Sequence, residues 1–278
     1  MLSKTTIAFL GAGNLAEAII SGLIASKTLG ASNIIASDKA SERLALMAER
    51  YEIRIVNNNL EAILNSDLVF LTVKPNDVKT VLTETVEAFD SDKVLISAAA
   101  GVTTDTILSV FADLKVKRPP MVVRAMPNTP VSVRQGATAV YAGQGADERA
   151  LGLARAVFES VGTVVVVNEE SLMDVVTGLS GSGPAYVFFF MEAMIAAGVE
   201  LGLAENDARA LALKTTLGAA QYAEASKASL TDLRRQVTSP NGTTMEGIKK
   251  LEETGFKDAV RSAVRAAAKR AKELSKGG

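Results

Sequence analysis

The chain has 278 residues, of which 48% are hydrophobic and 22% charged, a composition typical of a folded protein of about two domains. Its net charge is −1, so no basic field points to nucleic acid or to an anionic membrane surface as a partner. The absence of cysteine and histidine excludes disulfides and the commonest general base, so catalysis needs hydroxyls, carboxylates, lysines, backbone dipoles or a cofactor.

The first half of the chain alternates predicted strands and helices. Its opening stretch, MLSKTTIAFLGAGNL, is typical of a mature strand and turn rather than of a signal peptide, and we expect a cytoplasmic protein without a metal site. The predicted strands are 5–10, 33–37, 53–56, 68–73, 94–98, 121–125, 137–141 and 164–167, and the predicted helices are 15–25, 41–51, 60–64, 104–111 and 148–160. This alternation predicts an α/β domain built on a doubly wound, mainly parallel sheet that helices cover on both faces.

From residue 168 onward the pattern changes, because no segment favours a strand. Alanine and leucine at helical spacing dominate, and breaks fall at 181–184, Asn206, 239–242 and Gly255. We therefore expect a dinucleotide-binding domain over 1–167 and an all-helical domain over 168–278.

The predicted helix 184–203 is apolar on almost every side. It is about as long as a membrane span, but Glu192 and Glu200 lie in it and are costly in lipid, so we interpret it as a buried helix and expect no membrane partner. Such a helix must be covered all round. It is either the central core helix of its own domain or a helix shared with a second subunit.

A glycine motif follows the first strand. Gly11-x-Gly13-x-x-Ala16 opens a helix, which is the context that the dinucleotide-binding fingerprint needs. Gly11 permits the tight turn, Gly13 lets a pyrophosphate approach the backbone, and Ala16 permits close packing of helix on strand. The helix N-terminus offers free amides to the phosphates. The alternative is a glycine turn that serves packing alone.

The end of the second strand bears on the choice of cofactor. Asp38 lies where an acidic residue binds the ribose 2′-hydroxyl of NAD. Ser37, Lys39, Ser41 and Arg43 surround it and are suited to a 2′-phosphate. We favour NADP(H), with NAD(H) as the alternative. The cluster is also compatible with a solvated loop and a helix N-cap at Ser41.

Two further strand ends are expected to line the ligand crevice, which lies beyond the carboxyl ends of the strands in such sheets. Pro75 ends the fourth strand, and Lys74 is placed to reach a ribose or phosphate unless it is simply a surface lysine. After the fifth strand, the small residues 97–101 leave room for a flat ring against the backbone.

The segment SPNGTTME at 239–246 is the most informative part of the second half. Thr243-x-x-Glu246 matches a capping box, which predicts Thr243 as the N-cap of a helix that runs to Glu253. Thr244 then keeps its hydroxyl free beside backbone amides that suit a carboxylate. The structural alternative is a capped helix after a turn. Pro184 marks a second loop-to-helix junction at 181–184.

Together these segments resemble the pyrroline-5-carboxylate reductase family. The matching text is FLGAGNLAEAI, VKP, SAAAGVT, RAMPNTP, GLSGSGPAYVF and SPNGTTMEGIKKLEETGF, in the family's order and over nearly the whole chain. The resemblance implies a Rossmann N-terminal domain and an all-α C-terminal dimerisation domain. It further implies NAD(P)H-dependent reduction of Δ1-pyrroline-5-carboxylate to L-proline by a homodimer with intertwined C-terminal helices, often assembled into larger rings.

The resemblance also implies site residues. By position, the family's substrate contacts fall on Ser239, Gly242, Thr243 and Thr244, and Thr244 matches the threonine that hydrogen-bonds the ring nitrogen. The family's cofactor contacts fall on Leu10, Gly11, Ala12, Gly13, Asn14, Leu15, Ser37, Asn59, Thr72, Val73, Lys74, Pro75, Ala99 and Ala100. To these we add Lys39 from the cluster around Asp38.

Three positions depart from the family's pattern. Asn241 replaces the first of two glycines, but asparagine tolerates positive φ, so we expect the turn to survive. Lys227 and Arg235 stand where a glutamate and an aspartate are common.

In the mechanism that the family resemblance implies, the cofactor supplies the hydride, Thr244 orients or polarises the imine nitrogen, and no histidine is needed. One rival is a β-hydroxyacid dehydrogenase, but the expected lysine is missing from the helix after Pro184, and the next lysine is Lys214. The other is a non-catalytic nucleotide sensor or scaffold, which the SPNGTT segment disfavours.

Overall fold

The computed structural model describes residues 2–276, which divide into two compact units. The first unit holds the described residues up to Ser182 together with those from Arg265 onward, and the second unit is Gly183–Val264. The last strand ends at Val166, next to the expected boundary after residue 167. The first unit continues beyond that point, and it also takes in the end of the last helix.

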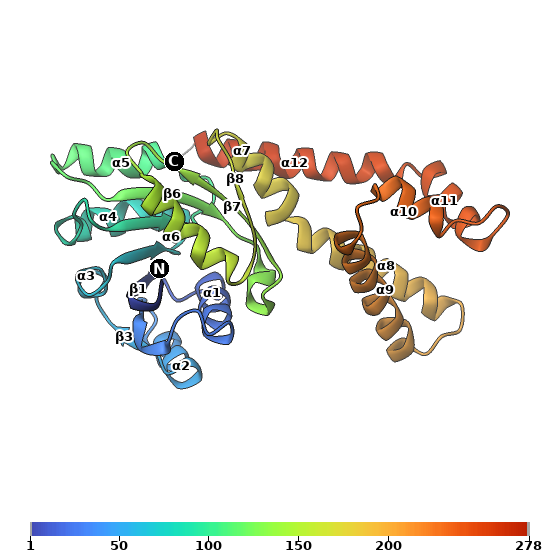
Figure 1. Cartoon of the computed structure of the whole chain (residues 1–278), viewed down its shortest axis with the longest axis horizontal. Coiled ribbons are helices and arrows are strands. Elements are labelled where there is room, and N and C mark those ends of the chain that lie inside the picture. Colours follow the sequence, from blue (N-terminus) through green and yellow to red (C-terminus); the bar gives the residue numbers. More distant parts are fainter. Residues whose placement is uncertain (1, 277–278) are drawn as a thin grey trace. The chain divides into compact units, whose positions relative to one another are not determined.

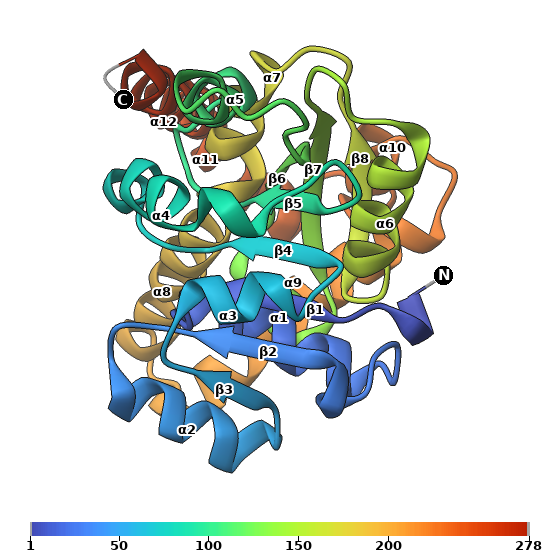
Figure 2. The same cartoon turned by 90° about the vertical axis from the view of Figure 1, so that its left-hand side faces the viewer.

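Within residues 2–276, eight strands form one sheet in the order β3-β2-β1-β4-β5-β6-β7-β8 (Figure 2). β6 and β7 are antiparallel and the other neighbours are parallel. The predicted doubly wound, mainly parallel sheet is therefore confirmed. The strands are β1 Ile7–Leu10, β2 Ile34–Ser37, β3 Arg54–Val56, β4 Leu68–Leu71, β5 Val94–Ser97, β6 Met121–Met126, β7 Gly136–Ala142 and β8 Gly162–Val166.

Helices cover both faces of this sheet because alternate residues of the central strands point to opposite sides. Phe9 and Phe70 stack in the core beneath α1, α2 and α6. Leu10 and Leu71 belong to the second core, beneath α3, α4 and α5. The helices of the first unit are α1 Asn14–Ala25, α2 Ser41–Tyr51, α3 Asn59–Leu64, α4 Val78–Thr85, α5 Thr104–Asp113, α6 Glu148–Glu159 and α7 Leu172–Val176 (Figure 1).

A buried ion pair ties α7 to the sheet. Arg124 on β6 is 4% exposed, and its Nη1 lies 3.2 Å from Glu170 Oε1 and its Nη2 lies 3.9 Å from Asp174 Oδ1. Glu170 also accepts hydrogen bonds of 2.8 Å from the backbone amide and from the hydroxyl of Thr104. These contacts explain why residues 168–182 pack with the strands.

The end of the last helix, α12 Phe256–Lys276, belongs to the first unit as well. Ser275 Oγ donates a 3.0 Å hydrogen bond to Asp174 Oδ1 on α7. Gly101, with φ 75°, lies so close to Leu274 that a Cβ added there would be 3.0 Å from the Leu274 Cβ. The last turns of α12 are therefore part of the first unit.

The second unit is helical, and among the described residues beyond 167 no strand occurs, as predicted. Its helices are α8 Gly183–Glu200, α9 Glu205–Ala225, α10 Leu230–Gln236, α11 Thr243–Glu253 and the first part of α12 Phe256–Lys276. The break expected at Asn206 is wrong by a few residues. Asn206 lies in the first turn of α9, and the chain turns at Gly202 with φ 102°.

α4 was not predicted from the sequence. Its β-branched valines and threonines have modest helix propensity and hide the pattern. The buried residues Val78, Val81, Leu82 and Thr85 nevertheless follow the i, i+3, i+4, i+7 spacing of an amphipathic helix.

α8 is exposed within the single chain. None of its described residues is buried, and Phe188 and Phe189 are 56% and 75% exposed. The interpretation of this segment as a central core helix of its own domain is therefore wrong. By length and composition the helical stretch Leu172–Glu200 could cross a membrane. Glu192 and Glu200 would oppose such a placement, because charged groups are costly in lipid.

Candidate functional site

The predicted cofactor residues of the first unit gather at one edge of the sheet. β1, β2, β4 and β5 are parallel, so their carboxyl ends share an edge, here called the carboxyl edge. Backbone hydrogen bonds join the segments there: Gly11 N donates to Ser37 O at 2.8 Å, and Thr72 N donates to Leu10 O at 3.0 Å. The edge thus brings together Leu10, Gly11, Ala12, Gly13, Asn14, Leu15, Ser37, Lys39, Thr72, Val73, Lys74, Pro75, Ala99 and Ala100.

The glycine loop Gly11–Gly13 has the geometry of a phosphate cradle. Gly11 has φ 97°, and a Cβ there would lie 3.0 Å from the carbonyl of Thr72. Gly13 is the N-cap of α1, and a Cβ there would meet no described atom within 4 Å, so the space before it is open. No described side chain caps α1, and its first amides stay available. These residues fit the pyrophosphate of a dinucleotide.

Asp38 and Arg43 hold the Ala12 peptide from both sides. The amide of Ala12 donates to Asp38 Oδ2 at 2.7 Å, and Arg43 Nε donates to the Ala12 carbonyl at 2.6 Å. The other carboxylate oxygen of Asp38 accepts a 2.9 Å hydrogen bond from Ala40 N. Both oxygens of the expected ribose-binding acid are therefore already hydrogen-bonded to backbone amides.

Glu17 joins α1 to α2 beside this loop. Its carboxylate accepts hydrogen bonds from Arg43, from Arg50 at 2.6 Å and from Tyr51 at 2.9 Å. Burial raises the pKa of Glu17, but the hydrogen bonds from Arg43, Tyr51 and Arg50 outweigh burial and leave it below its ordinary value. Burial and the neighbouring Glu17 raise the pKa of Tyr51. Glu17 was not predicted from the sequence, although residues 43, 50 and 51 lie on one face of α2 and indicate that this face has a shared partner.

The remaining first-unit residues differ in exposure. Ser37 is buried, and its Oγ donates a 2.6 Å hydrogen bond to Asn59 Oδ1, so this predicted pair is in contact. Lys39 and Lys74 are exposed, whereas Ala99 is buried at the end of β5. The edge therefore presents cations beside the glycine loop and small apolar groups at β5.

In the second unit, Ser239–Gly242 forms a tight turn. Pro240 stands at its second position, Asn241 adopts φ 57°, and Gly242 N donates to Ser239 O at 3.1 Å. A Cβ on Gly242 would be 2.4 Å from Ser239 Oγ, so any larger residue there would displace the Ser239 hydroxyl. The expectation that asparagine supports positive φ in this turn is confirmed.

The predicted capping box is wrong by one residue. Gly242, with φ −86° and ψ 167°, is the N-cap of α11, and no described side chain caps the helix. The turn brings Gly242 into extended backbone, so the helix begins at Thr243 and Thr244 is its second residue. Both threonines are exposed, and the cap uses neither hydroxyl. The helix start offers amides and two hydroxyls to a ligand.

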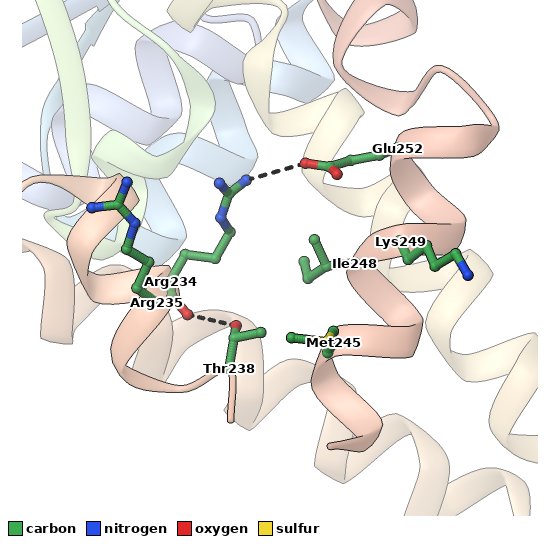
Figure 3. A pocket seen from close by; sticks show the side chains of 7 residues that line it. All are labelled: Arg234, Arg235, Thr238, Met245, Ile248, Lys249 and Glu252. Carbon is green, nitrogen blue, oxygen red and sulfur yellow. Dashed lines mark hydrogen bonds and ion pairs between the residues drawn. The ribbon is translucent and has the colours of Figure 1, made fainter. Parts of the chain in front are cut away.

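A groove of about 330 Å³ lies between α10 and α11, next to this turn (Figure 3). Arg234 lies 3.8 Å from Glu252 across the groove. Arg235, a departure from the family's pattern, pairs with Asp232 at 3.1 Å, and Lys227 is exposed in the loop before α10. The groove is lined by Arg234, Arg235, Thr238, Met245, Ile248, Lys249 and Glu252.

Comparisons with known proteins cover the whole chain. A family model described as pyrroline-5-carboxylate reductase dimerisation matches residues 170–274, and one described as NADP oxidoreductase coenzyme F420-dependent matches 6–101. A pyrroline-5-carboxylate reductase from Pseudomonas aeruginosa is 42% identical over 99% of this chain and 98% of the relative.

Two solved structures of such reductases are also similar. One from Coxiella burnetii is 38% identical, with TM-score 0.89 over 98% of this chain and 99% of that one. One from Plasmodium falciparum with NADP bound is 26% identical, with TM-score 0.86 over 98% and 99% of the two chains.

Proposed function

We propose that this chain, which belongs to the pyrroline-5-carboxylate reductase family, prefers NADPH to NADH when it reduces Δ1-pyrroline-5-carboxylate to L-proline in proline biosynthesis. The activity follows from a relative 42% identical along 99% of the chain. The preference for NADPH is supported by the state of Asp38.

Asp38 is poorly placed to select NADH. A carboxylate at the end of the second strand favours NAD by accepting the ribose 2′-hydroxyl. Here each of its oxygens already accepts a hydrogen bond from a backbone amide, one from Ala12 and one from Ala40. Asp38 therefore supports the glycine loop and has fewer lone pairs left for a ribose hydroxyl. Lys39 and Ser41 follow directly and are exposed, so they are suited to a 2′-phosphate.

The cofactor, when bound, supplies the hydride. In our proposal the amides of the glycine loop and of the α1 N-terminus hold its pyrophosphate. Lys74 contacts its ribose or phosphate. Ala99 and Ala100 leave room for the nicotinamide at the end of β5. The cofactor contacts proposed from the sequence, which include Asn14, Leu15, Asn59, Val73 and Pro75, remain part of this proposal.

The substrate is assigned to the start of α11. The amides of Thr243 and Thr244 and the hydroxyl of Ser239 bind its carboxylate in this proposal, with Gly242 beside them at the N-cap, because a helix N-terminus carries partial positive charge. The hydroxyl of Thr244 hydrogen-bonds the imine nitrogen, orients the C=N bond and makes its carbon a better acceptor of hydride. The exposure of both threonines and the absence of a side-chain cap support this assignment.

The proposal also assigns roles to the two parts of the chain. Residues 1–167 bind the dinucleotide, and residues 168–278 bind substrate and form the oligomer. The family's dimerisation model supports an oligomeric enzyme. We further propose a homodimer with intertwined C-terminal helices, a higher ring assembly of such dimers and a cytoplasmic location. The exposure of Phe188, Phe189 and Leu201 supports a second copy as the cover.

An absorbance assay tests the reaction and the cofactor preference together. It follows the oxidation of NADPH or of NADH in the presence of pyrroline-5-carboxylate. Lys39→Ala is expected to raise the KM for NADPH about tenfold, because a charge-assisted hydrogen bond to phosphate is lost. The KM for NADH is expected to stay within about twofold, since NADH has no 2′-phosphate. Lys79→Ala, an exposed lysine on α4, is the control. A lower KM for NADH than for NADPH in the unsubstituted chain would contradict the preference.

A further inference from the structure

The arginine that follows β2 contacts the glycine loop instead of extending into solvent. Arg43 lies in the first turn of α2, and its Nε donates a 2.6 Å hydrogen bond to the carbonyl of Ala12. A second guanidinium nitrogen, Nη2, pairs with Glu17 on α1. The Arg43 side chain is 24% exposed, and two of its three nitrogens are engaged within the first unit. Its situation therefore differs from that of Lys39, which is exposed at the same strand end.

The Ala12 carbonyl belongs to the peptide group that carries the Gly13 amide. This peptide group is planar and trans, so its carbonyl and its N–H point in opposite directions. Because Arg43 holds the carbonyl, the Gly13 N–H points away from the guanidinium. The preceding peptide group is held as well, since Ala12 N donates to Asp38 Oδ2 at 2.7 Å. Two consecutive peptide groups of the loop thus have side-chain partners that set their orientation.

The space before Gly13 is open to a ligand. A Cβ on Gly13 would meet no described atom within 4 Å, and no described atom accepts a hydrogen bond from the Gly13 amide. Gly13 is also the N-cap of α1, and no described side chain caps that helix. An anion in this space accepts hydrogen bonds from the Gly13 N–H and from the first amides of the helix together. The Gly13 amide takes part only if its peptide group is turned this way.

We propose that Arg43 is a positioning residue for the dinucleotide, because it orients the Ala12–Gly13 peptide so that the Gly13 amide faces the pyrophosphate. Glycine leaves the adjoining backbone free to rotate, so a peptide group beside it needs an outside partner to keep one orientation. Glu17 in turn holds the guanidinium of Arg43 against the loop. This inference rests on the proposed placement of the cofactor at the glycine loop.

This role predicts an equal effect of Arg43 on the two dinucleotides. NADPH and NADH share the pyrophosphate and differ in the 2′-phosphate, so a residue that shapes the pyrophosphate cradle contributes to both affinities. A residue that binds the 2′-phosphate, as proposed for Lys39, contributes to the affinity for NADPH alone. The ratio of the Kd for NADH to the Kd for NADPH therefore separates the two roles.

Two substitutions of Arg43 separate its hydrogen bond from its charge. In Arg43→Gln the side-chain amide nitrogen takes the place of Nε, so the donor to the Ala12 carbonyl is kept and the positive charge is lost. In Arg43→Met a methyl group stands there, and both are lost. The Kd for NADPH and the Kd for NADH are measured by fluorescence titration of the whole chain. We expect Arg43→Met to raise both about tenfold and Arg43→Gln to leave both within about threefold.

Arg50→Met is the matched control. Arg50 also lies on α2 and pairs with Glu17, but it forms no described hydrogen bond with the glycine loop. Because this ion pair is more exposed, we expect both Kd values to stay within about twofold. Urea unfolding checks that each variant folds. If Arg43→Met does not fold, the inference is overturned, because Arg43 is then needed for the unit as a whole rather than for one peptide group.

The remaining outcomes are equally decisive. A loss of NADPH affinity alone, in either Arg43 variant, makes Arg43 a ligand of the 2′-phosphate and overturns the inference. Normal affinities in Arg43→Met, equal losses in Arg43→Met and Arg43→Gln, or a matching loss in Arg50→Met overturn it as well. Failure of the unsubstituted chain to bind either dinucleotide overturns the proposed function together with this inference, whereas the other outcomes leave the proposed function in place.

Discussion

A threonine at the start of a helix can use its hydroxyl as a cap for a backbone amide or keep it available for a ligand. In α11 the N-cap is Gly242, so the hydroxyls of Thr243 and Thr244 do not cap the helix and both stay available for a ligand. They differ in position, because Thr243 is the first helical residue and Thr244 the second. The roles proposed for them are therefore separable by substitution without loss of a cap.

Thr244→Ala is expected to lower kcat/KM for pyrroline-5-carboxylate about a hundredfold, because a donor aimed at the reacting nitrogen is lost. Thr243→Ala, the neighbouring control, is expected to change it by less than about threefold, since its backbone amide remains. Steady-state kinetics with both variants and with Thr244→Ser, which keeps the hydroxyl, measure the contribution of the Thr244 hydroxyl to kcat/KM. Near-normal turnover of Thr244→Ala would refute the role proposed for the Thr244 hydroxyl. An equal loss in Thr243→Ala would show that this role is not specific to Thr244.

At this scale the sequence predicted residue types better than residue roles. Asn241 was predictable, because tolerance of positive φ is intrinsic to the side chain, and its φ of 57° agrees. The cap at Gly242 was not, because it depends on how the preceding turn orients the chain. The hydrogen bond from Ala12 N to Asp38 was not predictable either, since it joins residues 26 positions apart.

Between elements, one carboxylate of α1 makes all the side-chain hydrogen bonds to α2 that are described for this contact. Glu17 accepts hydrogen bonds from three side chains of α2, and Arg43 in turn holds the Ala12 carbonyl. The shape of the glycine loop is thereby connected to the docking of a helix. Strands were easier to predict than this contact, because a short apolar run such as Leu68–Leu71 identifies a buried strand by itself. α4 was missed because only its buried spacing, not its composition, is helical.

The pKa of Glu17 gives this contact a pH dependence. A folded-state pKa below the ordinary value of 4.5 means that the ionised carboxylate stabilises the folded chain. That stability is fully present above about pH 4.5 and is lost as the pH falls through the lowered pKa. Urea unfolding of Glu17→Gln is therefore expected to show a lower midpoint than the unsubstituted chain at pH 7, with the difference shrinking below pH 4.5.

Glu49→Gln is the matched control for this experiment, because Glu49 is an exposed carboxylate on α2. Its midpoint is expected to follow that of the unsubstituted chain at every pH. A difference between Glu17→Gln and the unsubstituted chain that stays constant down to pH 3 would contradict the role of the ionised carboxylate. Tyr51 contributes a second pH dependence of stability, at alkaline pH. Its raised pKa implies stability that is present below pH 10 and lost as the pH rises above it.

For the whole molecule, the second unit is incomplete as a single chain. A helix that is apolar all round needs cover on every side, yet Phe189 of α8 is 75% exposed and Leu201 just after it is 88% exposed. The family's dimerisation model spans 170–274, which includes this helix. The apolar surface of α8 is therefore expected to be covered when the chain assembles.

Phe189→Asp is expected to convert the oligomer to a 29.1 kDa monomer and to remove most activity, while NADPH binding by the first unit persists. A buried unpaired carboxylate in an interface costs several kcal/mol, but on an exposed helix it costs little. Leu64→Asp, at a residue of α3 that is 59% exposed, is the control and is expected to leave the mass unchanged. Light scattering measures the mass, and a Phe189→Asp variant that keeps the oligomeric mass would refute this role for α8.

The last turns of α12 have a consequence for how the protein is made. Leu274 packs on Gly101, and Ser275 donates a hydrogen bond to Asp174. The first unit therefore uses residues that the ribosome adds after the whole of the second unit. Domains commonly fold in order as they emerge during translation. Here the strands can pair early, but the loop after β5 lacks its packing partner until synthesis has passed residue 274. A nascent chain stalled within α12 is therefore expected to hold a formed sheet in which the loop after β5 is not yet packed.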